Sequence, residues 1–344
     1  MLSKARLDLY GEIGECIGNT PTVVYRGNVP NGNEITIKRE CDNLFGSHYD
    51  RVFVALFRHY EGVGAIQPGD KVIETTSGAA GVSFAGIGKR LGYECFVALP
   101  AGGEIAREEA IKAQLDSSDH LILTPECDYI SGFPEFLAKF LPQHRDYFFL
   151  NHSMGKRGSN NELTLTAMES IATELIENGN LDCFIPAVGN GSSVLGPGRK
   201  IKQLSNGLNV IAFETFQSAV AYELMNPGEY EKVYGIRPGS MSRHRLPGTS
   251  YPGISFPHII NAVNDSIIDE VMLVSDQMTD GEYHKLTGRK DTESLPHWDS
   301  EICDNGDLGR TGRAGIAVAL RLAEKIEDKK MAVIAYDKAD RYDD

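Results

Sequence analysis

Cysteine is sparse in this sequence, and no two cysteines stand close enough together to form a CxxC pair. The 344 residues contain six, at positions 16, 41, 95, 127, 183 and 303. Scattered single cysteines, in a chain that can bury a large core without staples, are typical of reduced thiols rather than of a disulfide framework or a zinc site. We therefore expect a cytoplasmic protein.

Positive charge is also in deficit. Lysine and arginine number 34 against 48 for aspartate and glutamate, which gives a net charge of −14. This balance argues against nucleic acid and anionic membranes as main partners. Apolar runs stay short of the roughly 20 residues of a membrane span, and the first residues lack the apolar stretch of a signal peptide. Small anions remain candidate ligands, because a loop of backbone N–H groups can bind them inside an acidic protein.

Short apolar runs alternate with longer amphipathic runs along the chain. This alternation predicts βαβ units, and so an α/β fold with twisted, mostly parallel sheets and helices on both faces. In such folds ligands bind at the carboxyl ends of the strands. The expected strands lie at 34–40, 70–78, 94–100, 120–125, 181–191, 209–215 and 330–337, and the expected helices at 51–64, 79–92, 107–118, 162–179, 194–204 and 314–328.

Residues 281–311 break this rhythm and show no clear period. A long irregular stretch in a compact domain is either a functional loop, such as a lid, or a solvated surface insertion. The polar and aromatic cluster here matches no compact zinc spacing, so a solvated loop is favoured over a metal site. The cluster comprises His297, Trp298, Asp299, Glu301, Cys303 and Asp304.

Two glycine-rich loops join an expected strand to an expected helix. The first, TTSGAAG at Thr75–Gly81, combines hydroxyls with a helix N-terminus that suits a carboxylate or phosphate. Taken alone, however, the loop favours an ordinary βα turn with Ser77 as the N-cap. The second, VGNGSS at Val188–Ser193, can hold a phosphate with backbone and hydroxyl donors. It is not a dinucleotide fingerprint, but two such loops favour a ligand with two anionic groups.

A series of motifs now follows in order along the chain: IGNTP at 17–21, KRE at 38–40, GSHYDR at 46–51, ETTSGAAG at 74–81, GY and ALP within 92–100, GNGSS at 189–193, GISFP at 253–257 and DKADRY at 337–342. Together they resemble the cysteine synthase and cystathionine β-synthase family, of the fold type II pyridoxal-phosphate (tryptophan synthase β-like) superfamily. The resemblance implies a homodimer of chains with two α/β domains and a cofactor between them. It places residues 1–44 and 151–344 in a larger domain and residues 45–150 in a smaller, mobile one.

The same resemblance exposes a replaced residue. In the family, the lysine of the GSxKDR turn forms a Schiff base with the cofactor and moves protons at the substrate. Here that position is Tyr49, and a phenol cannot form an imine. The family's TSGNTG loop also loses its asparagine to Ala79. Near the family's pyridine-contacting serine stand Thr311 and Arg313, with the register left open. Lys38, Lys71 and Lys156 are poor substitutes for the missing lysine.

The resemblance assigns the two loops to different groups of the ligand. The phosphate-binding or cofactor-binding residues are Gly189, Asn190, Gly191, Ser192, Ser193 and Thr311. The substrate-binding residues are Thr76, Ser77, Gly78, Ala79, Ala80, Asn151 and Arg243.

The candidate acid–base residues are Tyr49 and His48, since histidine titrates near neutral pH. Alternatively, Tyr49 only fills the volume of the lost lysine. We expect the side chain of His48 to face away from the cleft. Arg243, His244 and Arg245 form a basic cluster that serves either a second anionic group or merely a surface turn. His152, beside Asn151, is either cleft lining or a polar loop end.

Three functional hypotheses remain. The first is a cysteine-synthase-like protein of amino-acid metabolism that binds a small anionic metabolite and catalyses a reaction without a covalent cofactor. The second is a catalytically inactive metabolite sensor or regulatory partner. The third is an enzyme of amino-acid β-replacement or elimination that holds pyridoxal phosphate non-covalently. In none of them is pyridoxal phosphate expected as an internal aldimine.

Overall fold

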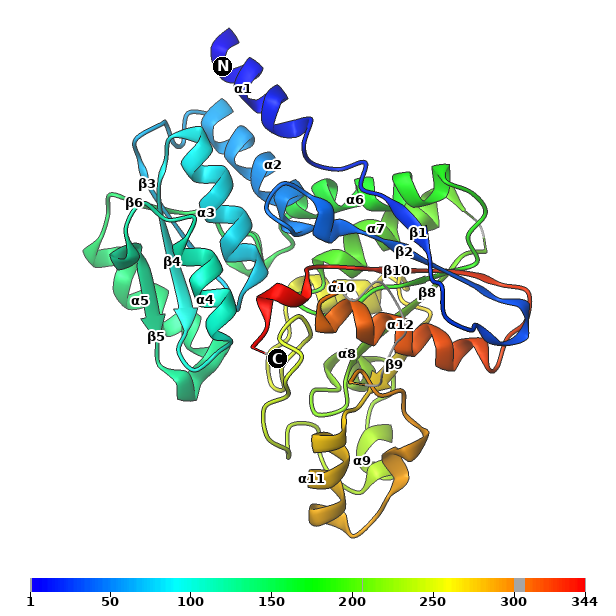
Figure 1. Cartoon of the computed structure of the whole chain (residues 1–344). Coiled ribbons are helices and arrows are strands. Elements are labelled where there is room, and N and C mark those ends of the chain that lie inside the picture. The colour runs from blue at the N-terminus through cyan, green and yellow to red at the C-terminus, as the bar shows by residue number, and fades with distance from the viewer. Residues whose placement is uncertain (1, 206, 300–306, 344) are drawn as a thin grey trace.

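Two α/β domains lie side by side in the computed structural model, which describes residues 2–205, 207–299 and 307–343 (Figure 1). The larger sheet has six strands in the order β1-β2-β10-β7-β8-β9, and the smaller has four in the order β5-β4-β3-β6. Neighbouring strands run parallel, except that β1 is antiparallel to β2. The predicted α/β architecture with mostly parallel sheets is confirmed.

The smaller sheet is built from one continuous stretch of chain. Its strands are β3 (Lys71–Thr75), β4 (Glu94–Pro100), β5 (Leu121–Thr124) and β6 (Tyr147–Phe149). Around it lie α2 (Tyr49–Gly62), α3 (Ala79–Leu91), α4 (Ile105–Lys112) and α5 (Phe133–Gln143). These elements fall within residues 45–150; the mobility of this part stays a prediction.

The larger sheet combines an N-terminal hairpin with the second half of the chain. Its strands are β1 (Thr22–Val24), β2 (Glu34–Lys38), β7 (Cys183–Ile185), β8 (Asn209–Thr215), β9 (Glu270–Val274) and β10 (Lys330–Ile334). Its helices are α6 (Glu162–Glu177), α7 (Ser192–Leu204), α8 (Val220–Met225), α9 (Glu229–Tyr234), α10 (Pro257–Asn264), α11 (Gln277–Thr287) and α12 (Arg310–Ala323), while α1 (Lys4–Gly14) lies at the N-terminus.

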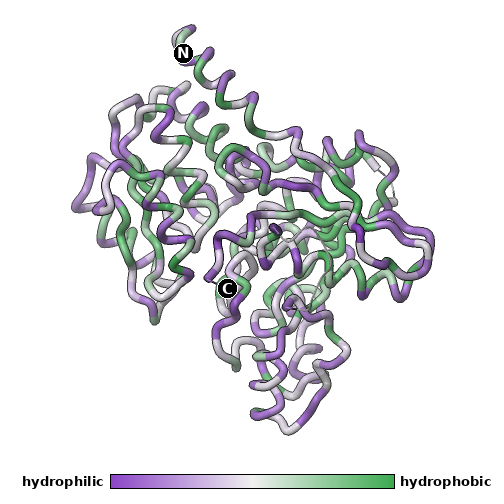
Figure 2. The backbone as a smooth tube through the Cα atoms, in the orientation of Figure 1, coloured by the Kyte–Doolittle hydropathy of each residue, from purple (hydrophilic) through white to green (hydrophobic). Residues whose placement is uncertain are grey.

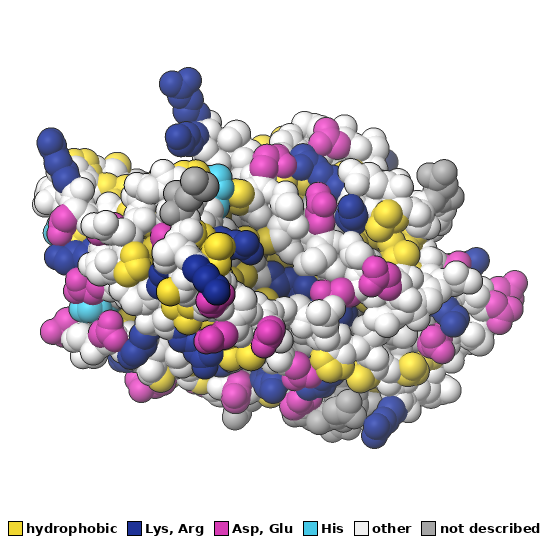
Figure 3. All heavy atoms as spheres, turned by 90° about the horizontal axis from the view of Figure 1, so that it is seen from above, with side chains coloured by type: hydrophobic (Ala, Val, Ile, Leu, Met, Phe, Trp, Pro, Cys, Tyr) yellow, Lys and Arg dark blue, Asp and Glu magenta, His cyan; other side chains and the backbone are white. Residues whose placement is uncertain are grey.

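Local chemistry sets the ends of these helices. Gly92 ends α3 in the left-handed conformation, with φ +84°, and its N–H bonds back to the carbonyls of Gly88 and Lys89. Asn161 begins α6 by accepting a hydrogen bond from the Thr164 amide at 3.2 Å. The strands β3, β4, β7, β8 and β10 are mostly buried, whereas β1 and β6 contain no fully buried residue. Figure 2 shows the hydrophobic stretches of chain in both domains. On the face seen in Figure 3, acidic and basic side chains intermingle.

The prediction that residues 281–311 are irregular is wrong in part. Residues up to Thr287 belong to α11, a short 3-10 turn covers Asp291–Ser294, and α12 begins at Arg310. Asp276 caps α11 by accepting from the Thr279 amide, a signal that lies before the segment and was missed. Residues 300–306 lie outside the described part of the chain, and with them Glu301, Cys303 and Asp304. Within the described residues, no helix is both long and apolar enough for a membrane crossing.

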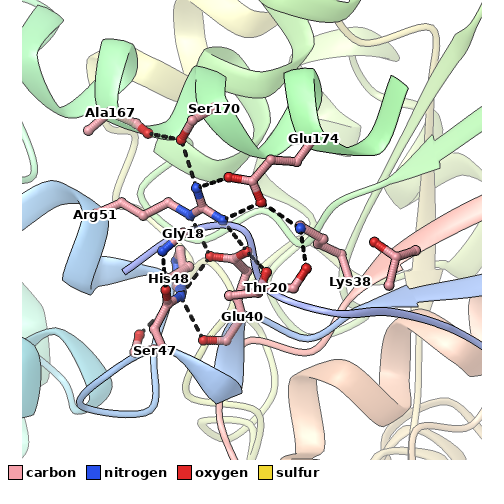
Figure 4. A network of polar contacts seen from close by, with 12 residues as sticks. Gly18, Thr20, Lys38, Glu40, Ser47, His48, Arg51, Ala167, Ser170 and Glu174 are labelled. Atoms are coloured by element: carbon pink, nitrogen blue, oxygen red, sulfur yellow. Dashed lines mark hydrogen bonds and ion pairs between the residues drawn. The ribbon is translucent and has the colours of Figure 1, made fainter. Parts of the chain in front are cut away.

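A buried network of charges joins α2 to the larger domain (Figure 4). Arg51 of α2 donates to both oxygens of Glu40 at 2.8 Å and to Glu174 of α6 at 2.5 and 2.9 Å. Lys38, at the end of β2, lies 2.6 Å from the same Glu174 carboxylate and also donates to the Thr20 carbonyl. Burial would raise the pKa of Glu174, but hydrogen bonds from Arg51 and Lys38 outweigh it and lower the pKa to about 2.

Removing the shared carboxylate should therefore be costly. In the variant Glu174→Ala, two buried cations lose a partner, and we expect the free energy of unfolding to fall by about 3–5 kcal/mol. The matched control is Glu162→Ala on the same helix, whose exposed pair with Arg199 should contribute less than about 1 kcal/mol. Urea denaturation measures both, and equal losses would contradict the importance of the network.

Buried neutral histidines make the fold sensitive to acid. Burial lowers the pKa of His258, which accepts the Asn161 amide through Nε2 at 2.9 Å, to about 4. The unfolded chain takes up this proton near the ordinary pKa of about 6.5, so stability is lost as the pH falls from about 6.5 towards 4. We expect His258→Gln to reduce the loss of unfolding free energy with falling pH by up to about 1.4 kcal/mol per pH unit. The control His59→Gln, at an exposed site, should leave the slope unchanged in denaturation titrations.

Candidate active site

A cavity of about 520 Å³ lies between the two domains. The carboxyl end of β3, the start of α2 and the loop before α7 all open into it. It brings together most of the predicted site residues: His48, Tyr49, Thr76, Ser77, Gly78, Ala79, Ala80, Asn151, Gly189, Asn190, Ser193 and Thr311. Gly191, Ser192 and Arg243 do not line it.

The Thr75–Ala80 loop presents an uncapped helix N-terminus to the cavity. The N-cap of α3 is Gly78, and no side chain bonds to the first turn of the helix, so the expected capping role of Ser77 is wrong. Instead Ser77 reaches the Pro247 carbonyl of the other domain at 3.5 Å, and Thr76 accepts the Gly78 amide at 2.9 Å. Gly78 is required because a Cβ atom there would lie 2.4 Å from the Arg107 guanidinium. The first amides of α3 thus remain available to an anion.

The Val188–Ser193 loop leads into α7, and one of its own side chains already bonds a backbone amide there. Asn190 turns back, and its side-chain oxygen accepts both the amide of Ser192 at 2.9 Å and its hydroxyl at 2.7 Å. Gly191 holds φ +89°, and a Cβ atom there would lie 2.6 Å from the Ile259 backbone nitrogen. One amide at the start of α7 is therefore taken by the chain itself, which reduces the donors left for a phosphate.

Tyr49 occupies the first turn of α2 and is half-buried in the cavity wall. Its ring meets the ring of His152 edge-on, with the centroids 5.2 Å apart. Burial raises the pKa of Tyr49 to about 12, while hydrogen bonding to the side chains of Ser192 and Asn190 acts in the opposite direction. The phenol therefore stays protonated at neutral pH and serves as a hydrogen-bond donor rather than a base.

The expectation that His48 faces away from the cleft is wrong. Its ring lines the cavity, buried between Tyr49 and Tyr336 at centroid distances of 4.1 and 4.9 Å. Burial lowers the pKa of His48 to about 3, so it is neutral and a weak base near pH 7. His152 lies beside it, and its backbone amide donates to the buried carboxylate of Glu74 at 3.0 Å.

Of the two residues left open at α12, Thr311 is the one that lines the cavity. It is buried, and its side chain lies against Gly248, whereas Arg313 is not among the lining residues. Asn151 follows β6 in the left-handed conformation, with φ +59°, which turns the chain into the cavity wall. At α12 the cavity is thus lined by a neutral hydroxyl rather than by a fixed charge, and its equivalence to the family's serine stays a prediction.

The sequence did not predict a buried ion pair that lines the cavity. Arg107 of α4 donates to Asp337 at 2.9 Å, and the ring of Tyr342 lies over the guanidinium at 4.5 Å. The Tyr342 hydroxyl donates to the same carboxylate at 3.0 and 3.1 Å. Burial raises the pKa of Asp337 against the opposing effect of Arg107. The DKADRY motif marked Asp337 and Tyr342, but nothing local indicated a partner 230 residues away.

The basic cluster lies at a second, adjoining pocket. Arg243 is exposed and lines a space of about 270 Å³ together with Arg107 and Arg245. Arg243 stacks on Tyr129 at 4.3 Å and donates to the Gly102 carbonyl, while Arg245 pairs with Asp276. Both arginines are therefore engaged with the chain itself. In the described residues no group of three or more acidic, histidine or cysteine side chains could hold a metal ion.

The cavity fits a phosphate group better than a covalently held pyridoxal phosphate. The two helix N-termini can bind an anion. No lysine is found among the described lining residues, and Ala79 offers no side-chain hydrogen bond. The lysines described above as poor substitutes for the Schiff-base lysine lie outside the cavity lining. Lys38 is held by Glu174, Lys71 pairs with Asp146, and Lys156 lies in a separate 3-10 turn.

Known proteins share this architecture along most of the chain. Residues 13–281 match the family described as "Pyridoxal-phosphate dependent enzyme". A cysteine synthase of Staphylococcus aureus is 28% identical over 75% of this chain and 79% of its own length. Cysteine synthase B of Escherichia coli is 25% identical over 95% of this chain and 93% of its own. The crystal structure of O-ureido-L-serine synthase superposes with a TM-score of 0.73 and 20% identity, covering 96% of this chain and 92% of that one. The chain therefore belongs to the family of pyridoxal-phosphate dependent enzymes, with cysteine synthases among its relatives.

Proposed function

We propose that this protein binds a small anionic metabolite, an amino acid or a phosphorylated compound, in the cavity between its domains and acts on it without a covalent cofactor. One observation carries the proposal: a protonated phenol, Tyr49, stands in the cavity wall. Its GSHYDR turn resembles the family's GSxKDR motif, which has the Schiff-base lysine at this position. The relatives named cysteine synthase support an amino acid as the ligand class.

The chain's own donors supply the binding. The start of α3 offers backbone amides and the Thr76 hydroxyl to one anionic group. The start of α7 and Ser193 face a second group, with fewer free amides because Asn190 caps the helix. Tyr49 donates a hydrogen bond to charge that develops on the ligand between them, as donors in an oxyanion hole do. The neutral His48 and Tyr336 close the site on the side of α2.

Pyridoxal phosphate, where an enzyme holds it through an imine, acts as an electron sink for carbanion chemistry. The residues around Tyr49 do not fit that attachment, and the proposed reaction depends on hydrogen-bond donors alone. Non-covalent binding of the cofactor phosphate at α7 is the competing function, and the glycine loop at that helix favours it.

Chemical trapping tests the proposal directly. Purified protein mixed with pyridoxal phosphate should show no saturable visible absorbance band. Borohydride treatment should leave no stoichiometric pyridoxyl label by peptide mass spectrometry. We expect the variant Tyr49→Lys to stay inactive as a cysteine synthase, because Ala79 and the GRTGRAG stretch at 309–315 also differ from the family pattern. One label per chain on a single lysine of the unaltered protein would overturn the proposal. A saturable spectrum without a label would favour the non-covalent enzyme, and tight binding without turnover would favour the sensor.

The role of Tyr49 as a donor predicts a specific loss. In Tyr49→Phe, the affinity for inorganic phosphate measured by calorimetry should fall roughly tenfold or more, as expected for a lost hydrogen bond to a charged group. Because burial raises the pKa of Tyr49 to about 12, the ratio of the two affinities should stay constant between about pH 6 and pH 9. Tyr60→Phe, on the same helix but outside the cavity, is the control. Equal affinities in all three proteins would mean that Tyr49 merely fills volume.

A further inference from the structure

Part of the cavity lining is apolar, which polar recognition of a small anion alone does not explain. Side chains from three separate segments contribute this part, here named the apolar wall: Ile130, Phe133, Leu137, Phe149, Met154 and Phe256. The first three come from the turn before α5 and from α5 itself, and the last comes from the start of α10 in the other domain. The polar groups described above belong to the same lining.

Helix α5 shows why this wall faces the cavity. Its sequence, FPEFLAKFLPQ, repeats apolar residues at helical spacing, yet none of its residues is fully buried. One apolar row packs onto the sheet edge, where Phe140 lies 5.2 Å from Tyr147 of β6 and the same distance from Phe136. The other row, Phe133 and Leu137 at i and i+4, lines the cavity.

Size supports a ligand with an apolar part. A volume of about 520 Å³ far exceeds what a small carboxylate needs, since a water molecule occupies only about 30 Å³ in the liquid. An apolar surface gains most from a matching apolar group, because that contact removes both surfaces from water. The small hydroxyls of Ser131, Ser153 and Ser255 interrupt these segments in the lining. Asn151 and His152 also lie among them, but most of the contact that the segments offer a substituent is apolar.

We infer that the ligand is an amphiphilic acid: its anionic head binds at the helix N-termini, and its substituent, a medium-length aliphatic chain or a single aromatic ring, lies against the apolar wall. This inference rests on the proposed function for the head group and adds the class of the substituent. The wall thereby acts as the specificity determinant of the cavity.

A series of straight-chain carboxylates tests the wall. Calorimetry with acetate, butanoate, hexanoate and octanoate at constant ionic strength should show affinity rising about three- to fourfold for each added methylene until the wall is covered. The variant Leu137→Asn, neutral and similar in size, should flatten this dependence and leave the affinity for inorganic phosphate unchanged. Ala138→Asn, at the neighbouring exposed position of α5, is the matched control and should retain the full dependence. Leu137 is only half-buried, so circular dichroism should show both variants folded.

The outcomes separate this inference from the proposed function. The apolar wall would be overturned as the substituent site by either of two results: an affinity in the unaltered protein that does not rise with chain length, or a rise in Leu137→Asn that equals that of the unaltered protein. Failure of both phosphate and acetate to bind would count against the proposed function, while the longer acids would still report on the wall through their chain-length dependence. If Leu137→Asn and Ala138→Asn lost the chain-length dependence of affinity equally, the effect would be a general one on α5 and would contradict the inference.

Discussion

The position of α2 depends on the pairing of Arg51 with one buried carboxylate, Glu40, and one half-buried carboxylate, Glu174. Arg51 stands two residues after Tyr49, and its guanidinium is held by Glu40 next to β2 and by Glu174 of α6. Buried charges are tolerated only with partners and good geometry, so the start of the helix cannot shift without breaking several hydrogen bonds. Tyr49, two residues before this anchor, points from a different face of the helix, and the anchor therefore holds it in the cavity wall. The same anchor fixes His48 against Tyr336, and burial makes that histidine neutral.

The positive charge that the site can offer an anion depends on how the arginines in and near the cavity are already paired. Arg107, which lines the cavity, is paired with Asp337, while Arg243 and Arg245 bond to the chain at the adjoining pocket. Besides the Nε of Arg107, which has no hydrogen-bond partner in the described part of the chain, what remains for an anion is a set of neutral donors: helix amides, hydroxyls and the phenol of Tyr49. Neutral donors aimed at one point recognise charge without adding a second buried ion, and they impose little pH dependence of their own.

Much of this arrangement could be predicted, because it is encoded locally. The alternation of strands and helices, the glycine ends such as Gly92 and the two loops are signals that span only a few residues. The pairing of Arg107 with Asp337 joins residues 230 positions apart, and no local pattern encodes it. The orientation of His48 was mistaken because a polar residue in a turn usually faces water, whereas packing against Tyr336 overrides that preference. The amphipathic pattern of α5 was visible in the sequence, but its unburied row has meaning only once the cavity beside it is known.

The C-terminal residues complete the boundary of the cavity from the far side. Asp337 holds Arg107, and Asp343 accepts the amides of Ile105 and Ala106 at the start of α4 at 2.6 and 2.8 Å. Arg310 of α12 adds a contact to Glu104 at 2.6 Å, just before the same helix. These bonds tie the smaller domain to the larger on one flank, while Arg51 ties α2 to it on the other. Helix α5 also borders the cavity, and none of its residues is fully buried. The helix that contributes Phe133 and Leu137 to the apolar wall can therefore move as a ligand enters with little loss of fully buried contacts.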